Sequence, residues 1–133
     1  MNKSYSSFVK EKIYTCYKLM AEYLTSDDVE DENAYCDMRN EIIKMKVCIP
    51  KEIFDKITKF AEDHLEPIIY DRDNFFADMY TEEFGYMDEN HCFHIKDEEA
   101  IHKQAGIYYT KLFDLTDQLE EFGMKEIYPI LTA

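Results

Sequence analysis

Apolar residues recur three and four positions apart along much of this chain, a spacing that places them on one face of an α-helix. The first stripe predicts a helix over residues 6–24, and the second predicts a helix over 34–45. Asp31 or Asn33 can cap the start of the second helix. The two stripes consist of Val9, Ile13, Cys16, Tyr17, Met20 and Leu24, and of Ala34, Met38, Ile42 and Met45.

The same spacing predicts two further helices. Pro50 fits the first position of a third helix, because its missing N–H costs nothing there, and this helix is expected to end near His64, before Pro67. Asp97 is the expected N-cap of the last helix, and Gly123 is expected to end it. The apolar faces are Ile53, Ile57, Phe60 and Ala61 in the third helix, and Ile101, Ala105, Tyr108, Leu112, Leu115, Leu119 and Phe122 in the last.

The pattern is least regular between residues 67 and 96. "PIIY", residues 67–70, fits a short strand, residues 73–84 fit a short helix with Gly85 just after it, and residues 86–96 fit a loop or a small hairpin. The 133 residues include only three Gly and three Pro, which argues against a turn-rich β-fold. No repeat or low-complexity linker is visible. The sequence therefore predicts one mainly α-helical domain over residues 1–133, with about five helices.

Composition narrows the function classes. An apolar fraction of 46% and an aromatic fraction of 15% argue against disorder despite the net charge of −14. A pI near 4.6 argues against direct binding to nucleic acid or anionic lipid, since phosphates are bound by Lys and Arg. No apolar run reaches the roughly 18 residues of a membrane helix. The four cysteines are scattered and the first residues are polar, so we expect a cytoplasmic protein with reduced thiols.

The negative charge is concentrated in two blocks. Residues 27–37 hold six acids and no base, and residues 62–99 hold thirteen acids against Arg72 and Lys96. Most such runs are solvated surface, but few of these acids have a Lys four positions on, and like charges this dense repel one another. A protein that normally binds DNA through a basic groove is the partner class that such a surface fits, because carboxylates can stand in for phosphates.

Several stretches resemble the phage Ocr-like antirestriction family. They are "IYTCYKLMAEYL", "SDDVEDEN", "YCDMRNEII" and "VCIP" in the first half, and "AGIYYTKLFDLTDQLEEF" in the last helix. The resemblance implies an elongated, mostly helical homodimer that mimics bent DNA and occupies the DNA-binding groove of type I restriction-modification enzymes. It carries over Asp27, Asp28, Glu30, Asp31, Glu32 and Asp37 as phosphate mimics, and Ile57, Phe60 and Ala61 as the dimer contact.

The second acidic block adds further candidates for contact with the partner. The chain departs from the family by its lysines between residues 44 and 59 and by an apolar C-terminal stretch in place of an acidic tail. A mimic directed at a CRISPR nuclease would look much the same, and a helical adaptor with an apolar groove is a further alternative. The added acids are Glu62, Asp63, Glu66, Asp71, Asp73, Asp78, Glu82, Glu83, Asp88 and Glu89.

Other chemistry has weaker signals. His91, Cys92 and His94 lie close together, but no C-x-x-C pair accompanies them, as a structural zinc site would require. Glu99 and His102 form a single E-x-x-H, whereas a di-iron bundle needs two. Phosphate-binding glycine motifs are absent from the sequence. We therefore expect no enzyme activity, no cofactor and no metal, with a small metal-dependent enzyme as the alternative.

Overall fold

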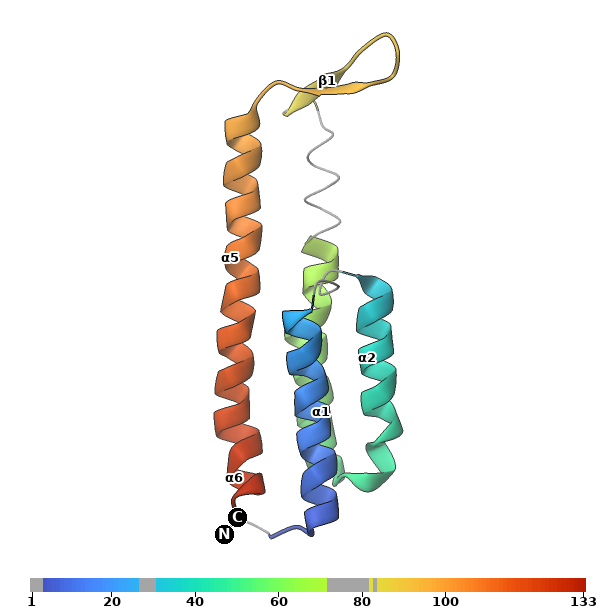
Figure 1. Ribbon diagram of the computed structural model, residues 1–133, viewed down its shortest axis with the longest axis vertical. Coiled ribbons are helices and arrows are strands. Elements are labelled where there is room, and N and C mark those ends of the chain that lie inside the picture. The colour runs from blue at the N-terminus through green and yellow to red at the C-terminus, as the bar shows by residue number, and fades with distance from the viewer. Residues whose placement is uncertain (1–3, 27–30, 72–81, 83) are drawn as a thin grey trace.

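The computed structural model describes residues 4–26, 31–71, 82 and 84–133, which form an elongated, mainly helical rod (Figure 1). The predicted fold class, mainly α-helical with a short hairpin between residues 67 and 96, is confirmed. The principal elements are α1 (Ser7–Thr25), α2 (Glu32–Lys44), α3 (Lys51–Phe60), β1 (Gly85–Met87), β2 (Phe93–Ile95), α5 (Glu98–Phe122) and α6 (Tyr128–Leu131).

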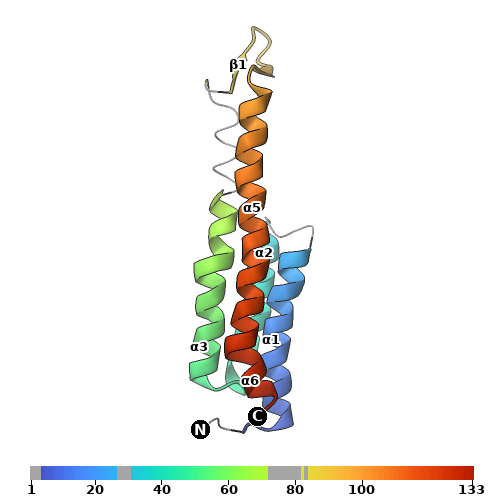
Figure 2. The same cartoon turned by 90° about the vertical axis from the view of Figure 1, so that its left-hand side faces the viewer.

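The helices divide the rod into a thick body and a narrow extension. α1, α2, α3 and the second half of α5 pack side by side in the body, and α5 continues beyond the end of α1 to the hairpin (Figures 1 and 2). We call the end that carries β1 and β2 the hairpin end. At the opposite end, the terminal end, α1 begins and α6 stops, and the Lys10 ammonium donates a hydrogen bond to the Ala133 carbonyl at 2.7 Å.

Local capping explains where three helices begin. The Ser6 hydroxyl accepts from the Val9 N–H at 3.3 Å at the start of α1. Asp31 and Asp97, both predicted as caps, each place a carboxylate oxygen on a backbone N–H of the following helix, at 2.9 and 3.0 Å. Each cap satisfies a donor that has no partner within the helix. The helix starts predicted from the sequence therefore differ from the observed starts by two residues at most.

The core lies in the body. Ile13, Met20, Ile42, Ile57 and Leu65 are almost completely buried, and they come from α1, α2 and the third helix. The apolar stripe of α5 is buried unevenly. Leu115 and Leu119 belong to the core, whereas Ile101 and Ala105, nearer the hairpin, are only half-buried.

The third helix continues past Pro67, so the expected end near His64 and the expected strand over residues 67–70 were wrong. Residues 66–71 are α-helical. The turn Ala61–Leu65 is π-helical, and the Glu66 N–H donates to the Ala61 carbonyl across this wider turn. In a regular α-helix the ring of Pro67 would clash with the carbonyl four residues before it, and a π-turn immediately upstream relieves that clash.

The last helix also continues through a π-turn, so the expectation that Gly123 ends it was wrong as well. Gly123 has ordinary helical dihedral angles and begins a second π-turn, Gly123–Ile127, which precedes Pro129. A Cβ on Gly123 would lie 2.5 Å from the Tyr17 hydroxyl oxygen, so close packing against α1 explains the glycine. The two π-turns are neighbours, since the rings of Phe60 and Phe122 stack with centroids 4.8 Å apart.

The hairpin pairs Gly85 with Ile95, Tyr86 with His94 and Met87 with Phe93. The loop or hairpin expected over residues 86–96 is thus confirmed as a hairpin. Gly85 is the first residue of β1. The helix expected over residues 73–84 lies largely outside the described residues. Among the helices that the structure describes, none has both the length and the apolar character needed to cross a membrane.

Candidate functional site

Ten of the sixteen acids proposed as phosphate mimics lie in the described part of the chain, and none of the ten is buried. Glu66, Asp71 and Asp88 are partly covered, and the other seven are exposed. Placement on the surface is what a partner-binding role requires. The remaining six, Asp27, Asp28, Glu30, Asp73, Asp78 and Glu83, lie outside the described residues.

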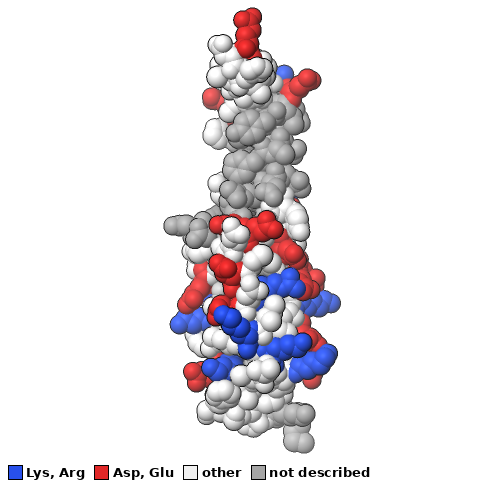
Figure 3. Space-filling model, turned by 90° about the vertical axis from the view of Figure 1, so that its right-hand side faces the viewer, with Lys and Arg blue, Asp and Glu red and all other residues white. Residues whose placement is uncertain are grey.

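The exposed acids gather on the side of the body nearer the hairpin. On the face that carries α2, carboxylates cluster around the hairpin-ward end of the body, and Lys and Arg side chains lie nearer the terminal end (Figure 3). Two of the predicted acids are matched by a base: Glu62 pairs with Arg39 at 2.7 Å, and Asp71 pairs with Lys111 at 3.4 Å.

Seven of the predicted acids form no ion pair with any residue in the described part of the chain. We call this set the acidic surface. Five members lie at the start of α2, within α2 and on the third helix, and Glu82 and Glu89 lie apart from them in the hairpin region. The seven acids are Asp31, Glu32, Asp37, Asp63, Glu66, Glu82 and Glu89.

Acids toward the terminal end have a different environment. Lysines pair with Glu41 at 2.7 Å, with Asp55 at 2.8 Å and with Glu126 at 2.9 Å, and Lys125 pairs with Glu121 within one helical turn. The hydrogen bond from Lys56 to Glu126, followed by the attraction between their charges, raises the pKa of Lys56. Four acids toward the terminal end are therefore matched by lysines, whereas Glu11 and Glu52 form no ion pair with the described residues.

Asp88 is built into the hairpin. Its carboxylate accepts from the Asn90 N–H at 2.8 Å and the Cys92 N–H at 2.9 Å, and it bonds Nε2 of His94 at 2.6 Å. The bond to His94, followed by the backbone bond from Cys92, lowers the pKa of Asp88 below its usual value. Because its oxygens are already engaged, this residue shapes the turn more than it presents charge to a partner.

The residues assigned to a dimer contact need correction. Ile57, Phe60 and Ala61 are 0%, 7% and 3% exposed and belong to the core of their own chain. Phe60 covers Phe122, and Ile57 is closed off within the body. These side chains offer a second chain almost no surface, so a dimer contact is not proposed on them.

The His91, Cys92 and His94 group sits on the hairpin. His91 adopts a left-handed backbone conformation with φ 62°. His91, Cys92 and His94 are all exposed, and of the three only His94 is paired with a described acid, Asp88. The His94 ring stacks on Tyr86 at 5.2 Å. Within the described residues, no three His, Cys, Asp or Glu side chains come close enough together to hold a metal ion.

A small pocket lies between α2 and the third helix, beside the acidic surface. Its volume is about 100 Å³, and we call it the α2 pocket. Tyr35 is 2% exposed, and its hydroxyl has no hydrogen-bond partner among the residues that the structure describes. An unpaired buried hydroxyl costs about 1–3 kcal/mol. The lining residues are Glu32, Tyr35, Cys36, Arg39, Glu66, Ile69 and Tyr70.

Electrostatics in the α2 pocket keep Tyr35 neutral. Burial of the phenol, followed by the nearby Glu66 carboxylate, raises the pKa of Tyr35 to about 12. Arg39 acts in the opposite direction but is itself held by Glu62. The pocket therefore combines a neutral phenol with two carboxylates, Glu32 and Glu66, that have no ion-pair partner among the described residues.

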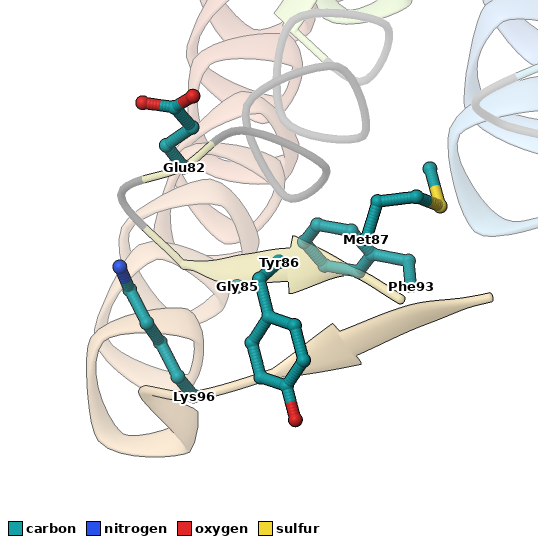
Figure 4. Close-up of a pocket in the computed structure, with 6 residues that line it drawn as sticks. All are labelled: Glu82, Gly85, Tyr86, Met87, Phe93 and Lys96. Atoms are coloured by element: carbon teal, nitrogen blue, oxygen red, sulfur yellow. The ribbon is translucent and has the colours of Figure 1, made fainter. Parts of the chain in front are cut away.

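A larger hollow of about 490 Å³ lies at the hairpin end (Figure 4). Tyr86, Met87 and Phe93 supply its apolar wall, and Glu82 and Lys96 lie on its opposite side (Figure 4). Tyr86 and Met87 are more than half exposed. The hollow adds apolar surface next to one acid of the acidic surface, Glu82.

Sequence reasoning missed the α2 pocket. Tyr35 lies three residues before Met38 and seven before Ile42, so the apolar stripe of α2 can be started at Tyr35 as readily as at Ala34. That choice would have identified Tyr35 as a core residue. Its unpaired hydroxyl depends on the third helix and carries no signal in the sequence.

No protein-family model, curated protein or solved structure matches this chain. The resemblance to the Ocr-like antirestriction family therefore stays a prediction from the quoted motifs.

Proposed function

We propose that this protein inhibits a host defence enzyme that binds DNA, either a type I restriction-modification complex or a similar nuclease, by presenting carboxylates in place of backbone phosphates. The observation that carries the proposal is the acidic surface. Its seven carboxylates lie at the surface of an elongated, mainly helical molecule without matching bases in the described part of the chain.

The physical mechanism has two parts. Long-range Coulomb attraction steers the net charge of −14 toward a basic groove and raises the rate of encounter. Charge-assisted hydrogen bonds from Arg and Lys to the carboxylates then hold the complex. Because the carboxylates carry no base edges, inhibition is expected to be independent of the DNA sequence that the enzyme reads.

The first experiment measures inhibition of DNA cleavage by a purified type I restriction enzyme and by a CRISPR nuclease, each at low and high salt. Inhibition should compete with DNA and weaken as salt rises, since charges beyond about 8 Å are screened at physiological ionic strength. Failure to inhibit any such enzyme, or inhibition that is flat across salt concentrations, would contradict mimicry.

A second experiment uses matched charge variants. The first variant replaces Glu32, Asp63 and Glu66 of the acidic surface by amides, and the control replaces the exposed acids Glu11, Glu52 and Glu120. Both remove three negative charges, so steering by net charge falls equally. A much larger loss of inhibition in the first variant is expected. Equal losses would mean that only total charge matters.

A helical adaptor is the second candidate. Tyr109 and Phe113 are 55% and 74% exposed and lie four residues apart on one face of α5. This pair offers apolar contact to a partner helix, or to a second copy of the chain in the proposed homodimer. Phe113→Ala should leave nuclease inhibition intact under the mimicry proposal, and loss of inhibition would favour the adaptor. Analytical ultracentrifugation of the same variant tests the homodimer.

A further inference from the structure

We propose that the α2 pocket is a receptor for one arginine side chain of a basic protein partner. The inference rests on the proposed function for the identity of that partner, but the pocket itself is defined by its own residues. It would give the acidic surface a shaped anchor point in addition to its diffuse charge.

Charge favours a cation as the occupant. Glu32 and Glu66 reach the pocket from two different helices, and neither forms an ion pair within the described residues. Arg39 also lines the pocket, but its guanidinium is held by Glu62 at 2.7 Å. An anion entering the pocket would meet two free carboxylates, whereas a cation would pair with both.

Shape and chemistry favour guanidinium over ammonium. A planar guanidinium has donors on several sides, so it can bond carboxylates from both helices, and a shift of the Tyr35 ring would let it donate to the Tyr35 hydroxyl, whose oxygen has almost no accessible surface in the empty pocket. Tyr70, which is exposed, supplies an aromatic face at the pocket for stacking. The volume of about 100 Å³ is sufficient for such a group.

The Tyr35 hydroxyl is the observation that distinguishes this pocket from ordinary acidic surface. The Tyr35 side chain is buried, its ring packs edge-on against Tyr23 with centroids 6.0 Å apart, and its oxygen has no hydrogen-bond partner in the described part of the chain. A phenylalanine would fill the same space without leaving a polar group unsatisfied. The hydroxyl therefore contributes nothing to folding through hydrogen bonds, but it could accept a hydrogen bond from a bound ligand.

The test is titration of the ¹⁵N-labelled protein with N-acetyl-arginine amide, N-acetyl-lysine amide and sodium phosphate, monitored by amide chemical shifts. Arginine amide should shift the signals of residues 32–39 and 66–70 and bind more tightly than lysine amide. Stronger binding of phosphate, or shifts spread over all acidic segments with no preference for arginine, would overturn the proposal.

Variants make the assignment specific. Glu66→Gln should weaken binding of arginine amide about tenfold, the effect of losing one charge-assisted bond. Asp63→Asn removes the same charge three residues away, outside the pocket lining, and should change affinity less than twofold. Equal losses in the two variants would overturn the pocket as the binding site.

Tyr35→Phe separates binding from stability. It should weaken binding of arginine amide while the melting temperature stays the same or rises. A lower melting temperature with unchanged affinity would overturn the role of the hydroxyl.

The arginine-binding proposal and the proposed function can be rejected independently of each other. If Glu66→Gln loses arginine binding but inhibits a nuclease as well as wild type, mimicry stands without an arginine anchor in this pocket. If arginine binds as described but no DNA-binding enzyme is inhibited, the pocket stands and the proposed function fails.

Discussion

The two ends of the rod share α5 but differ in what its side chains do. Toward the terminal end, Leu115 and Leu119 are buried, Gly123 packs against Tyr17, and acids pair with lysines. Toward the hairpin end, Ile101 and Ala105 are only half-buried, and aromatic side chains such as Tyr109 are exposed.

The difference indicates that one part of the molecule supplies most of the folding free energy and another carries the surface proposed to bind a partner. Apolar burial is the main source of folding free energy, and it is concentrated where α1, α2, the third helix and the second half of α5 pack together. Unmatched negative charge opposes folding, and it is concentrated on the hairpin-ward side. A terminal end that folds tightly can support a hairpin-ward surface that is organised for a partner.

The largest expected contrast is between buried and exposed apolar side chains. Ile57→Ala should lower the free energy of unfolding by about 2–5 kcal/mol, because the cavity in the core cannot collapse fully. Phe113→Ala should change it by less than about 0.5 kcal/mol, since that ring is 74% exposed. Urea unfolding measures both. Comparable losses would mean that Phe113 is covered, for example by a second chain.

Replacing Gly106 in α5 and Gly123 in the π-turn after it by alanine should change the stability in opposite directions. Gly123→Ala places a methyl group against the Tyr17 ring and should destabilise the protein by about 1–3 kcal/mol. Gly106→Ala meets open space on the extension and should stabilise by about 0.5–1 kcal/mol through better helix propensity. Thermal unfolding checks both, and a stabilising Gly123→Ala would show that α1 does not pack against the second π-turn.

Tyr35, where the body meets the acidic surface, should make stability depend on alkaline pH. Its folded pKa of about 12 exceeds its ordinary value of 10.0, so its contribution is complete below pH 10 and is lost as pH rises toward 12. At pH 11 the wild type should have lost about 1 kcal/mol relative to Tyr35→Phe. Urea unfolding of both proteins at pH 8 and pH 11 tests this, and parallel losses would contradict it.

Single charge removals should give the smallest effects and opposite signs at the two ends. Glu126→Gln breaks the pair with Lys56 and should cost about 0.2–1 kcal/mol. Asp37→Asn, in the interior of α2, relieves repulsion within the acidic surface and should be neutral or slightly stabilising. Unfolding at low salt shows the contrast best, and added salt should reduce it. A destabilising Asp37→Asn would mean that this acid has a folding role.

Local sequence determined the helices and their starts. The three-and-four spacing of apolar residues and the caps Asp31 and Asp97 act within one or two turns, so they can be read without tertiary structure. The acids identified from charge blocks also lie on the surface wherever the structure describes them, because unpaired charge is expensive to bury.

Contacts between distant segments decided the rest. "FAEDHLEP" and "FGMKEIYP" share a Phe, a small residue and a Pro at matching positions. The π-turns that precede these prolines, and the stacking of Phe60 on Phe122 beside them, are nevertheless seen only in the tertiary structure. The burial of Ile57, the need for Gly123 and the unpaired Tyr35 hydroxyl likewise depend on a neighbouring helix. Periodicity specifies which face of a helix is apolar, but packing in three dimensions decides what that face meets and which polar group is left without a partner.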